Sequence, residues 1–286
     1  VWTKRIGNSP TKKVLLLHGG PGGTHEYLEA FDSHFPAAEI EYTYYDQLGS
    51  TYSDQPDEPE LWTIARFVEE IEQVRRARHL DASNFYLYGH SWGGILALEY
   101  ALTYQQHLKG LIISNIMASI PAADAFCAST LLPAIDPGAR SELEELEAAK
   151  DYENPRYGAL VFQHYYLKFM LRMPPGAWPE PLGRMIAHRN LAISRHLRGP
   201  SAFTHTGPLA HWDRTADLGK VAVPTLTIGA TYDFHDPAHV KWMAEQVQHG
   251  RYLHCPNGSH VPLYDDPEPY FEGIIRFIED VDAARF

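Results

Sequence analysis

Short apolar runs alternate with amphipathic stretches through the first 114 residues of the chain. Four runs rich in apolar and aromatic residues predict strands, at 13–17, 40–45, 85–88 and 111–114. Two stretches between them predict helices; the first, in 62–80, has apolar residues at helical spacing: Ile64, Phe67, Val68, Ile71 and Val74. The second helix is expected over 95–104. Strands that alternate with helices predict a mostly parallel sheet with helices on both faces.

The alternation stops after residue 114 and resumes near residue 215. The intervening segment has no convincing buried strand, and many prolines interrupt it. Helices are expected at 141–149, which opens with a Ser-x-x-Glu capping pattern at Ser141, and at 157–172, which is rich in aromatic residues. The segment therefore predicts an α-helical cap inserted into an α/β core.

Strands and helices alternate again toward the end of the chain. Strands are expected at 223–229 and 251–254, and helices at 237–248 and 270–281. The predicted organisation is one α/β core formed by 1–114 and 215–286, with the cap over 115–214.

A nucleophile motif lies between the strand at 85–88 and the helix that follows. Residues 89–93 match G-x-S-x-G, with Ser91 at the centre. In this strand–turn–helix context the serine hydroxyl projects above the carboxyl end of the sheet, where α/β sheets bind ligands. Glycines two residues before and after the serine leave room for the backbones packed beside the turn. Ser91 is therefore the predicted nucleophile of an α/β-hydrolase fold.

Acyl transfer needs two backbone N–H groups to bind the oxyanion that forms at the attacked carbonyl. One is expected from Trp92, the residue after the nucleophile. The other is expected from the glycine-rich loop after the first buried strand, with Gly20 as the donor. Glycine suits this place because a side chain would block the approaching carbonyl. The adjacent Gly19 is expected to contact the substrate.

The acid and base of a triad follow the nucleophile in this fold in the order Asp or Glu, then His. Asp233 comes just after the strand at 223–229 and is the predicted acid. Asp236 is the alternative, but Asp236 followed by Pro237 fits the start of a helix better. Among sixteen histidines, His260 is the predicted base, because it follows the last strand and its loop.

Composition excludes several other classes of function. The formal net charge is −12, and an acidic chain without basic clusters disfavours nucleic-acid and membrane partners. No glycine loop matches a nucleotide-binding pattern and no metal-ligand spacing is complete, so neither a metal nor another cofactor is expected. The two cysteines are expected to be buried thiols, which favours a cytoplasmic location. Because the sequence begins at Val1 rather than Met, a signal peptide that was cleaved from upstream remains an alternative.

Several motifs together resemble the proline iminopeptidase (prolyl aminopeptidase) family. They are His-Gly-Gly-Pro-Gly at 18–22, Asp-Gln-Leu-Gly at 46–49, Gly-His-Ser-Trp-Gly-Gly at 89–94, Tyr-Glu-Asn-Pro at 152–155, Gly-Pro at 199–200 and Gly-Ser-His at 258–260. The resemblance covers nearly the whole chain. It implies an acyl-enzyme peptidase that removes an N-terminal residue, often proline, from short peptides, with Ser91, Asp233 and His260 as its triad.

The sequence departs from that family at the positions that bind a substrate amine. Family members use two cap glutamates, and the matching positions here are Ala202 and Phe234. A desolvated ammonium without a carboxylate loses several kcal/mol of binding. Three other carboxylates are candidates to replace them: Glu153, Asp213 and Asp236.

The departure leaves three functions open. The favoured one is an aminopeptidase or amidase of the family. The alternative is a carboxylesterase, lactonase or other small-molecule acyl hydrolase on the same scaffold. A non-catalytic binding protein is disfavoured by the complete set of triad residues.

Overall fold

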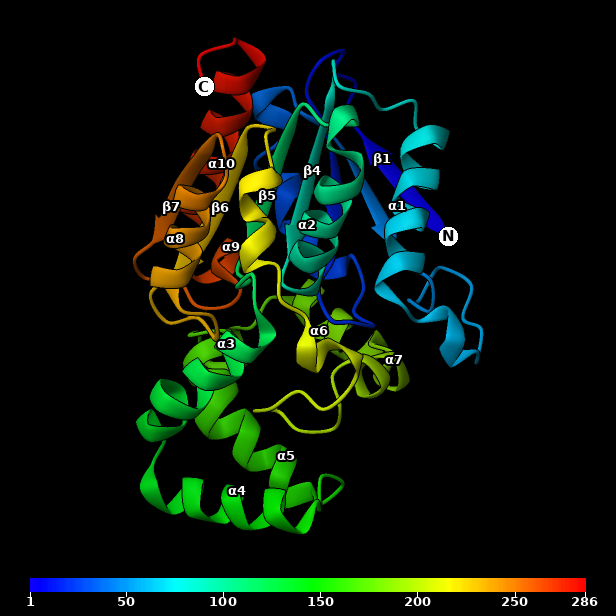
Figure 1. The fold of residues 1–286 in the computed structure, drawn as a ribbon. Helices are drawn as coiled ribbons and strands as arrows, with labels where there is room; N and C mark the ends of the chain where they lie inside the picture. Colours follow the sequence, from blue (N-terminus) through cyan, green and yellow to red (C-terminus); the bar gives the residue numbers. More distant parts are fainter.

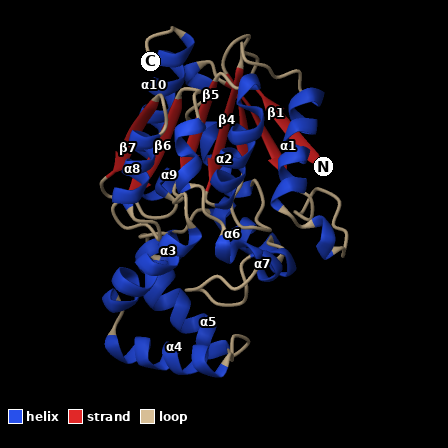
Figure 2. Cartoon of the chain, in the orientation of Figure 1, coloured by secondary structure: helices blue, strands red, loops and turns tan.

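The computed structural model describes residues 1–286, which form one seven-stranded sheet with helices around it (Figures 1 and 2). The strand order is β1-β3-β2-β4-β5-β6-β7; β1 runs antiparallel to β3 and every other pair is parallel. The strands are β1 (Trp2–Ile6), β2 (Lys13–Leu17), β3 (Glu41–Asp46), β4 (Phe85–His90), β5 (Gly110–Ser114), β6 (Thr225–Ala230) and β7 (Gly250–Cys255). The predicted mostly parallel sheet is confirmed.

Successive side chains of the central strands point to opposite faces of the sheet, as the two-residue period of a strand requires. On β2, Leu15 and Leu17 belong to one buried cluster, while Val14 and Leu16 belong to the other. The first cluster lies under helices α1 (Ile64–Ala77), α2 (Trp92–Tyr104) and α8 (Pro237–Gln246). The second lies under α10 (Pro267–Asp282) and the 3-10 helix η1 (Glu26–Ser33). Helices therefore cover both faces, as predicted.

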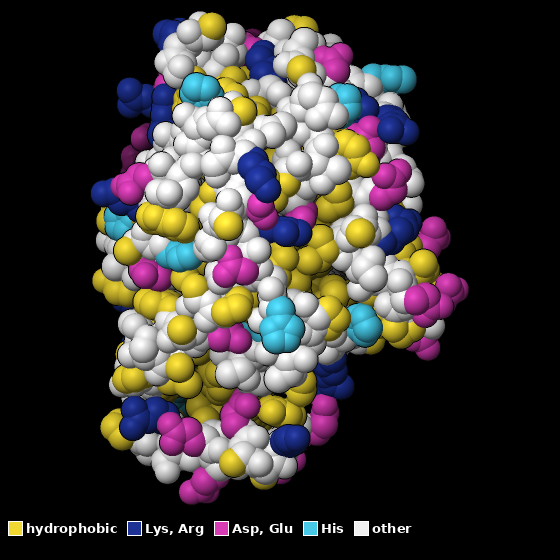
Figure 3. Space-filling view, viewed as in Figure 1, with side chains coloured by type: hydrophobic (Ala, Val, Ile, Leu, Met, Phe, Trp, Pro, Cys, Tyr) yellow, Lys and Arg dark blue, Asp and Glu magenta, His cyan; other side chains and the backbone are white.

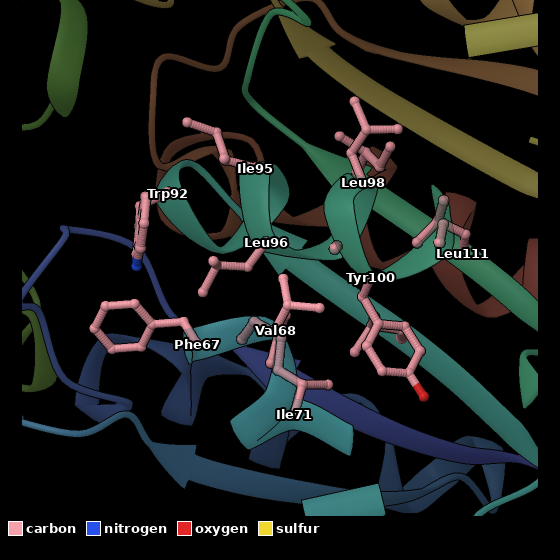
Figure 4. Packing of buried hydrophobic residues seen from close by; sticks show 14 of the residues in the cluster. Phe67, Val68, Ile71, Trp92, Ile95, Leu96, Leu98, Tyr100 and Leu111 are labelled. Carbon is pink, nitrogen blue, oxygen red and sulfur yellow. The ribbon is translucent and has the colours of Figure 1, made fainter. Parts of the chain in front are cut away.

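Helix α2 carries the residue next to the predicted nucleophile and is fixed by its packing on α1. Figure 4 shows the apolar side of α1, with Phe67, Val68 and Ile71, against Trp92 and Leu96 of α2. The Phe67 and Trp92 rings meet edge to face with centroids 5.7 Å apart. Ten of the thirteen α2 residues are buried, so the start of this helix is held in one position.

The segment between β5 and β6 is helical and lies beyond the lower ends of the strands in Figure 1. Its α-helices are α3 (Ile120–Phe126), α4 (Pro137–Ala149), α5 (Pro155–Val161), α6 (Glu180–His188) and α7 (Leu191–Leu197). Backbone hydrogen bonds join it to loops that follow β2 and β7, and two of them lie close to the predicted site. The Asn190 N–H donates to the Gly22 oxygen at 2.7 Å, and the His260 N–H donates to the Phe169 oxygen at 2.9 Å.

Two predicted helix starts in this segment are wrong. Helix α4 begins at Pro137 rather than Ser141, because Asp136 caps it by accepting from the Ala139 N–H at 3.0 Å. The helix expected over 157–172 begins at Pro155 behind the cap Asn154, and its second half, Phe162–Met170, is π-helical. In both places a proline in the first turn and the polar residue before it set the start.

Charge is spread over the surface without a dominant sign on the face drawn in Figure 3, where acidic and basic side chains are interspersed. Both cysteines are free and buried, Cys127 among the inserted helices and Cys255 at the end of β7. None of the helices combines the length and apolar character that crossing a bilayer requires.

Candidate active site

Ser91 lies in the sharp turn between β4 and α2. Its backbone has φ 55° and ψ −122°, a conformation that L-residues rarely adopt and that a packed surrounding must hold. The flanking glycines allow the close packing: a Cβ on Gly89 would lie 2.1 Å from the Gly93 oxygen. A Cβ on Gly93 would lie 2.3 Å from the Leu17 oxygen, on β2. The turn therefore presents the hydroxyl at the carboxyl end of the sheet, as the motif predicts.

The structure brings the three predicted triad residues together from the ends of three strands. His260 Nε2 lies 3.0 Å from Ser91 Oγ, and His260 Nδ1 lies 2.7 Å from Asp233 Oδ1. With the Nδ1–H donating to the carboxylate, Nε2 is free to accept the hydroxyl proton. This geometry is that of a serine nucleophile, its general base and the acid that orients the base.

Asp233 is buried and has a second polar partner. Asn115, at the end of β5, donates its Nδ2–H to Asp233 Oδ2 at 2.8 Å. Asp236, the alternative acid, accepts from the Ala238 N–H at 2.9 Å and caps α8. The two aspartates therefore have separate places, one beside His260 and one at a helix start.

Burial controls the protonation of the site. Burial, followed by the positive charge of Arg198, lowers the pKa of His260 to about 3. The imidazole is therefore neutral at pH 7, which is the form that can take the Ser91 proton. Burial raises the pKa of Asp233, while the charge of His235 and the Asn115 hydrogen bond act in the opposite direction.

The backbone N–H groups of Gly20 and Trp92, the predicted oxyanion donors, make no hydrogen bond within the protein. Trp92 is the first residue of α2, where N–H groups are left unpaired by the helix. Gly20 has φ 139°, and a Cβ there would lie 2.5 Å from the Gly23 nitrogen, so no other residue fits without strain. Gly19 lies close to Ser91, since a Cβ on it would be 3.2 Å from the Ser91 Cβ.

A buried chain of hydrogen bonds connects this loop to the base, and sequence reasoning missed it. The Gly19 N–H donates to the Tyr27 hydroxyl, which donates to His90 Nδ1, both at 2.8 Å. His90 Nε2–H then donates to the His260 carbonyl oxygen at 2.7 Å. Burial lowers the pKa of His90 to about 3, which keeps the ring neutral for this pairing. The only signal in the sequence is that His90 precedes the nucleophile.

Gln47 connects the glycine loop to Trp92 and was also missed. Its side-chain oxygen accepts from Trp92 Nε1 at 2.8 Å, and its Nε2 donates to the His18 oxygen at 3.0 Å. The signal was the Asp-Gln-Leu-Gly segment directly after β3. Gln47 therefore joins the first residue of the glycine loop, His18, to the side chain of Trp92.

The two positions that replace the amine-binding glutamates differ in their contacts. Phe234 lies beside the base, with its ring 4.8 Å from that of His260, and stacks on Tyr165 at 4.9 Å. Ala202 belongs to the same apolar surroundings, and its N–H donates to the Tyr157 hydroxyl at 2.9 Å. An aromatic ring and a methyl group therefore stand at the two positions that match the family's amine-binding glutamates.

The three candidate replacement carboxylates are engaged elsewhere. Glu153 pairs with Arg195 at 2.5 Å, and Asp213 accepts from the Ser119 hydroxyl at 2.8 Å. Asp236 caps α8. None of the three is in hydrogen-bond contact with the triad, so the expectation that one of them takes over the amine gains no support.

Known proteins with similar sequences cover nearly the whole chain. A family model described as the alpha/beta hydrolase fold matches residues 12–153. The proline iminopeptidase of Chitinophaga pinensis is 50% identical, over 99% of this chain and 95% of that protein. The proline iminopeptidase of Elizabethkingia meningoseptica is 49% identical, over 100% of this chain and 96% of that protein.

Solved structures give the same answer for the fold. The crystal structure of VinJ superposes with a TM-score of 0.91 at 29% identity, covering 98% of this chain and 95% of that one. A proline iminopeptidase from Mycobacterium smegmatis superposes with a TM-score of 0.89 at 24% identity, covering 100% and 96%. The predicted fold is confirmed by both, and the esterase alternative is not favoured by the curated relatives. This chain is a serine hydrolase of the proline iminopeptidase family, built on the α/β-hydrolase fold.

Proposed function

We propose that this enzyme releases the N-terminal residue, proline or another small apolar residue, from short peptides or amides through an acyl-enzyme on Ser91. One observation carries the proposal: Ser91 Oγ, His260 and Asp233 form a continuous hydrogen-bonded chain, with distances of 3.0 and 2.7 Å. The names of the curated relatives, proline iminopeptidase, support the choice of substrate.

The mechanism follows from the donors and acceptors in place. Neutral His260 takes the Ser91 proton at Nε2 while Oγ attacks the peptide carbonyl, and Asp233 stabilises the imidazolium that forms. The oxyanion is bound by the N–H groups of Gly20 and Trp92. His260 then gives the proton to the leaving amine. A water molecule, deprotonated by the same base, releases the acyl group and restores Ser91.

The domain division is part of this proposal. Residues 115–214 act as a cap over the core formed by 1–114 and 215–286, and enclose the substrate at the carboxyl end of the sheet. The backbone hydrogen bond from His260 to Phe169, and the ring contact of Phe234 with the base, support this role. A closed site of this kind favours short peptides over folded proteins. We also propose a cytoplasmic location, which the two free cysteines support.

The test compares an amide and an ester of matched size. We expect release of p-nitroaniline from proline p-nitroanilide, and loss of about 10⁴-fold or more in kcat for Ser91→Ala. A fluorophosphonate probe should label the wild-type protein and not Ser91→Ala. Ser129→Ala is the control, since this exposed serine in the inserted helices contacts Thr130 and no residue of the triad, and it should keep its labelling.

The outcomes separate the proposal from its alternative. Rapid hydrolysis of a p-nitrophenyl ester with amide turnover at background would favour the esterase. Absence of fluorophosphonate labelling in the wild-type protein would refute catalysis through Ser91 altogether.

A further inference from the structure

The triad has no free carboxylate beside it that could pair with the amine of a substrate. An aminopeptidase holds the α-amine of its substrate close to the reacting carbonyl, and near pH 7 this amine carries a positive charge. Both oxygens of Asp233 are already engaged, since Oδ1 contacts His260 at 2.7 Å and Oδ2 accepts from Asn115 at 2.8 Å. No other carboxylate is hydrogen-bonded to His260 or Ser91.

Glu147 is the carboxylate that side-chain contacts connect to Ala202. Its Oε1 accepts from the hydroxyls of Tyr157 and Ser201, at 2.5 and 2.9 Å. The Tyr157 hydroxyl accepts in turn from the Ala202 N–H at 2.9 Å. The contacts that lead from there to the base pass through four ring pairs: Tyr157 with Phe203, Phe203 with Tyr165, Tyr165 with Phe234, and Phe234 with His260. Glu147 therefore contacts the inserted helices and not the triad.

The ring of Phe234 lies directly against the base. Its centroid is 4.8 Å from that of His260, with an angle of 44° between the two planes. Tyr165 stacks on the Phe234 ring at 4.9 Å, and Tyr166 meets it edge to face at 6.1 Å. The closest neighbours of the base on this side are therefore aromatic.

Partial exposure shows which of these groups a substrate can reach. Phe234 and Tyr166 are partly exposed, as Ser91 and His260 are, whereas Tyr165 is buried. Because Tyr165 covers one face of the Phe234 ring, the exposed part of the ring is the other face or the edge. His260 contacts both Ser91 and Phe234, so a substrate attacked by Ser91 lies near the exposed part of this ring.

We propose that the partly exposed rings of Phe234 and Tyr166 bind the amine of the substrate through cation–π contacts, in place of a carboxylate. The inference rests on the proposed aminopeptidase function and names how that function recognises its substrate. A ring face attracts an ammonium group, and it also binds an uncharged apolar group of the same shape. The enzyme should therefore cleave amides of uncharged cyclic acids as well as amides of proline.

The preference for a charged amine is expected to be modest. A cation–π contact strengthens binding by about 3- to 30-fold, depending on how far the pair is removed from water. The charge of Arg198, which adds to burial in lowering the pKa of His260, opposes a second cation near the base. The uncharged substrate should therefore be slower than the charged one, but still well above background.

The experiment compares two anilides of equal shape. Proline p-nitroanilide carries the amine, and cyclopentanecarboxylic acid p-nitroanilide has a carbon in place of the ring nitrogen. At about pH 6.5, where the amine is protonated, we expect kcat/KM of the wild-type enzyme to favour the proline compound by about 3- to 30-fold.

Three substitutions at one position test the source of this preference. Phe234→Leu keeps an apolar side chain without a ring and should bring the ratio of the two kcat/KM values close to one. Phe234→Trp should keep the ratio or raise it, because indole binds cations best among the aromatic side chains. Phe234→Glu should raise the ratio by about 10-fold over the wild type, because a carboxylate pairs with the ammonium group.

Two control variants separate this contact from general effects. Phe162→Leu removes a ring from the same π-helix as Tyr166, but this exposed ring contacts Trp178 and should leave the ratio unchanged. Glu147→Gln keeps the size of the side chain and removes its charge, and it should also leave the ratio unchanged. A ratio of two substrates cancels any loss of active protein in each variant.

The possible outcomes support or overturn the proposal. A wild-type ratio of one, a ratio that Phe234→Leu leaves at its wild-type value, or a ratio that falls to one in Glu147→Gln would overturn it. The last of these results would assign the amine to Glu147. No detectable cleavage of the cyclopentane compound by an enzyme active on proline p-nitroanilide would also contradict it.

Failure of the proposed function gives a different result. In that case the wild-type protein cleaves neither anilide, although fluorophosphonate still labels Ser91. Prolinamide and cyclopentanecarboxamide are then compared as ligands that protect Ser91 from labelling. The ratio of their dissociation constants tests the aromatic amine site without any turnover, and Phe234→Leu should again bring it close to one.

Discussion

The catalytic edge of the sheet and the aromatic cluster of the inserted helices are built in different ways. At the catalytic edge, formed by Ser91, Asp233 and His260, each polar side chain has a specific hydrogen-bond partner at the end of a strand. The aromatic cluster is held mainly by rings that pack on one another, with one hydroxyl, that of Tyr157, donating to Glu147 at 2.5 Å. Its members are Tyr157, Tyr165, Phe169, Phe203 and Phe234.

This difference separates chemistry from specificity. Hydrogen bonds at the catalytic edge tolerate little change, because a base or donor that is out of place no longer stabilises the transition state. Apolar packing tolerates substitutions of similar volume, so the cluster can change shape while the protein stays folded. We therefore expect substitutions at the edge to change kcat, and substitutions in the cluster to change KM and stability.

The largest effect is expected for Asp233→Asn. The amide cannot accept the His260 Nδ1–H as a carboxylate does, so the ring favours the wrong tautomer and loses support for its positive charge. We expect kcat to fall by about 10⁴-fold with little change in KM. Steady-state hydrolysis of proline p-nitroanilide measures both constants.

Asp236→Asn is the matched control for that substitution. It weakens the cap of α8 at most modestly, since asparagine also caps helices, and should leave kcat within about twofold. A large loss of kcat in Asp236→Asn together with an active Asp233→Asn would exchange the roles of the two residues.

Phe203→Ala tests the aromatic cluster. Phe203 is 5% exposed and its ring packs on Tyr165 at 5.0 Å. Removing it should lower the free energy of unfolding by about 3 kcal/mol and raise KM for proline p-nitroanilide, while the labelling rate of Ser91 with a small fluorophosphonate stays unchanged. Phe277→Ala, in the cluster under α10, should cost similar stability without changing KM. Slow labelling in Phe203→Ala alone would show that the cluster also sets the chemistry.

The two regions also differ in how far the sequence predicts them. The nucleophile turn is a local feature, since strand, glycines and helix are neighbours along the chain. Asp233 and His260 follow the ends of strands, so parallel topology alone places them near Ser91. This is why three residues far apart in sequence were correctly expected to meet at one edge of the sheet.

Contacts between side chains that are distant along the chain could not be predicted from the sequence. The hydrogen bond from Tyr27 to His90 joins residues 63 positions apart, and the bond from His90 to His260 joins residues 170 apart. No pattern indicates such pairs before the elements are packed. In the inserted helices, the start of α4 was misplaced because the Asp136–Pro137 pair begins the helix ahead of Ser141.

Tyr27→Phe tests whether the edge depends on the contacts that the sequence did not reveal. The change removes the acceptor of the Gly19 N–H and the donor to His90 together. We expect kcat to fall by about 10-fold at nearly constant KM, because the glycine loop and the His260 backbone lose their common support. Tyr86→Phe removes another buried hydroxyl, bonded to the Ile278 oxygen far from the triad, and should leave kcat unchanged. Equal effects in both variants would mean that only general stability was changed.

The smallest expected effect concerns the pH dependence of the edge. The proposed mechanism needs neutral His260, and burial together with the Arg198 charge lowers the pKa of this group from 6.5 to about 3. Activity is therefore retained as the pH falls below 6.5, and the acid limb of kcat/KM should lie well under that value. His90 and His235, the other histidines against this ring, also have pKa values lowered to about 3 by burial, so neither adds a limb near neutrality. Arg198→Gln removes a positive charge that opposes protonation and should move the limb upward. A wild-type limb at pH 6.5 or above would mean that the free enzyme leaves His260 open to water, and that the inserted helices enclose the triad only after substrate binds.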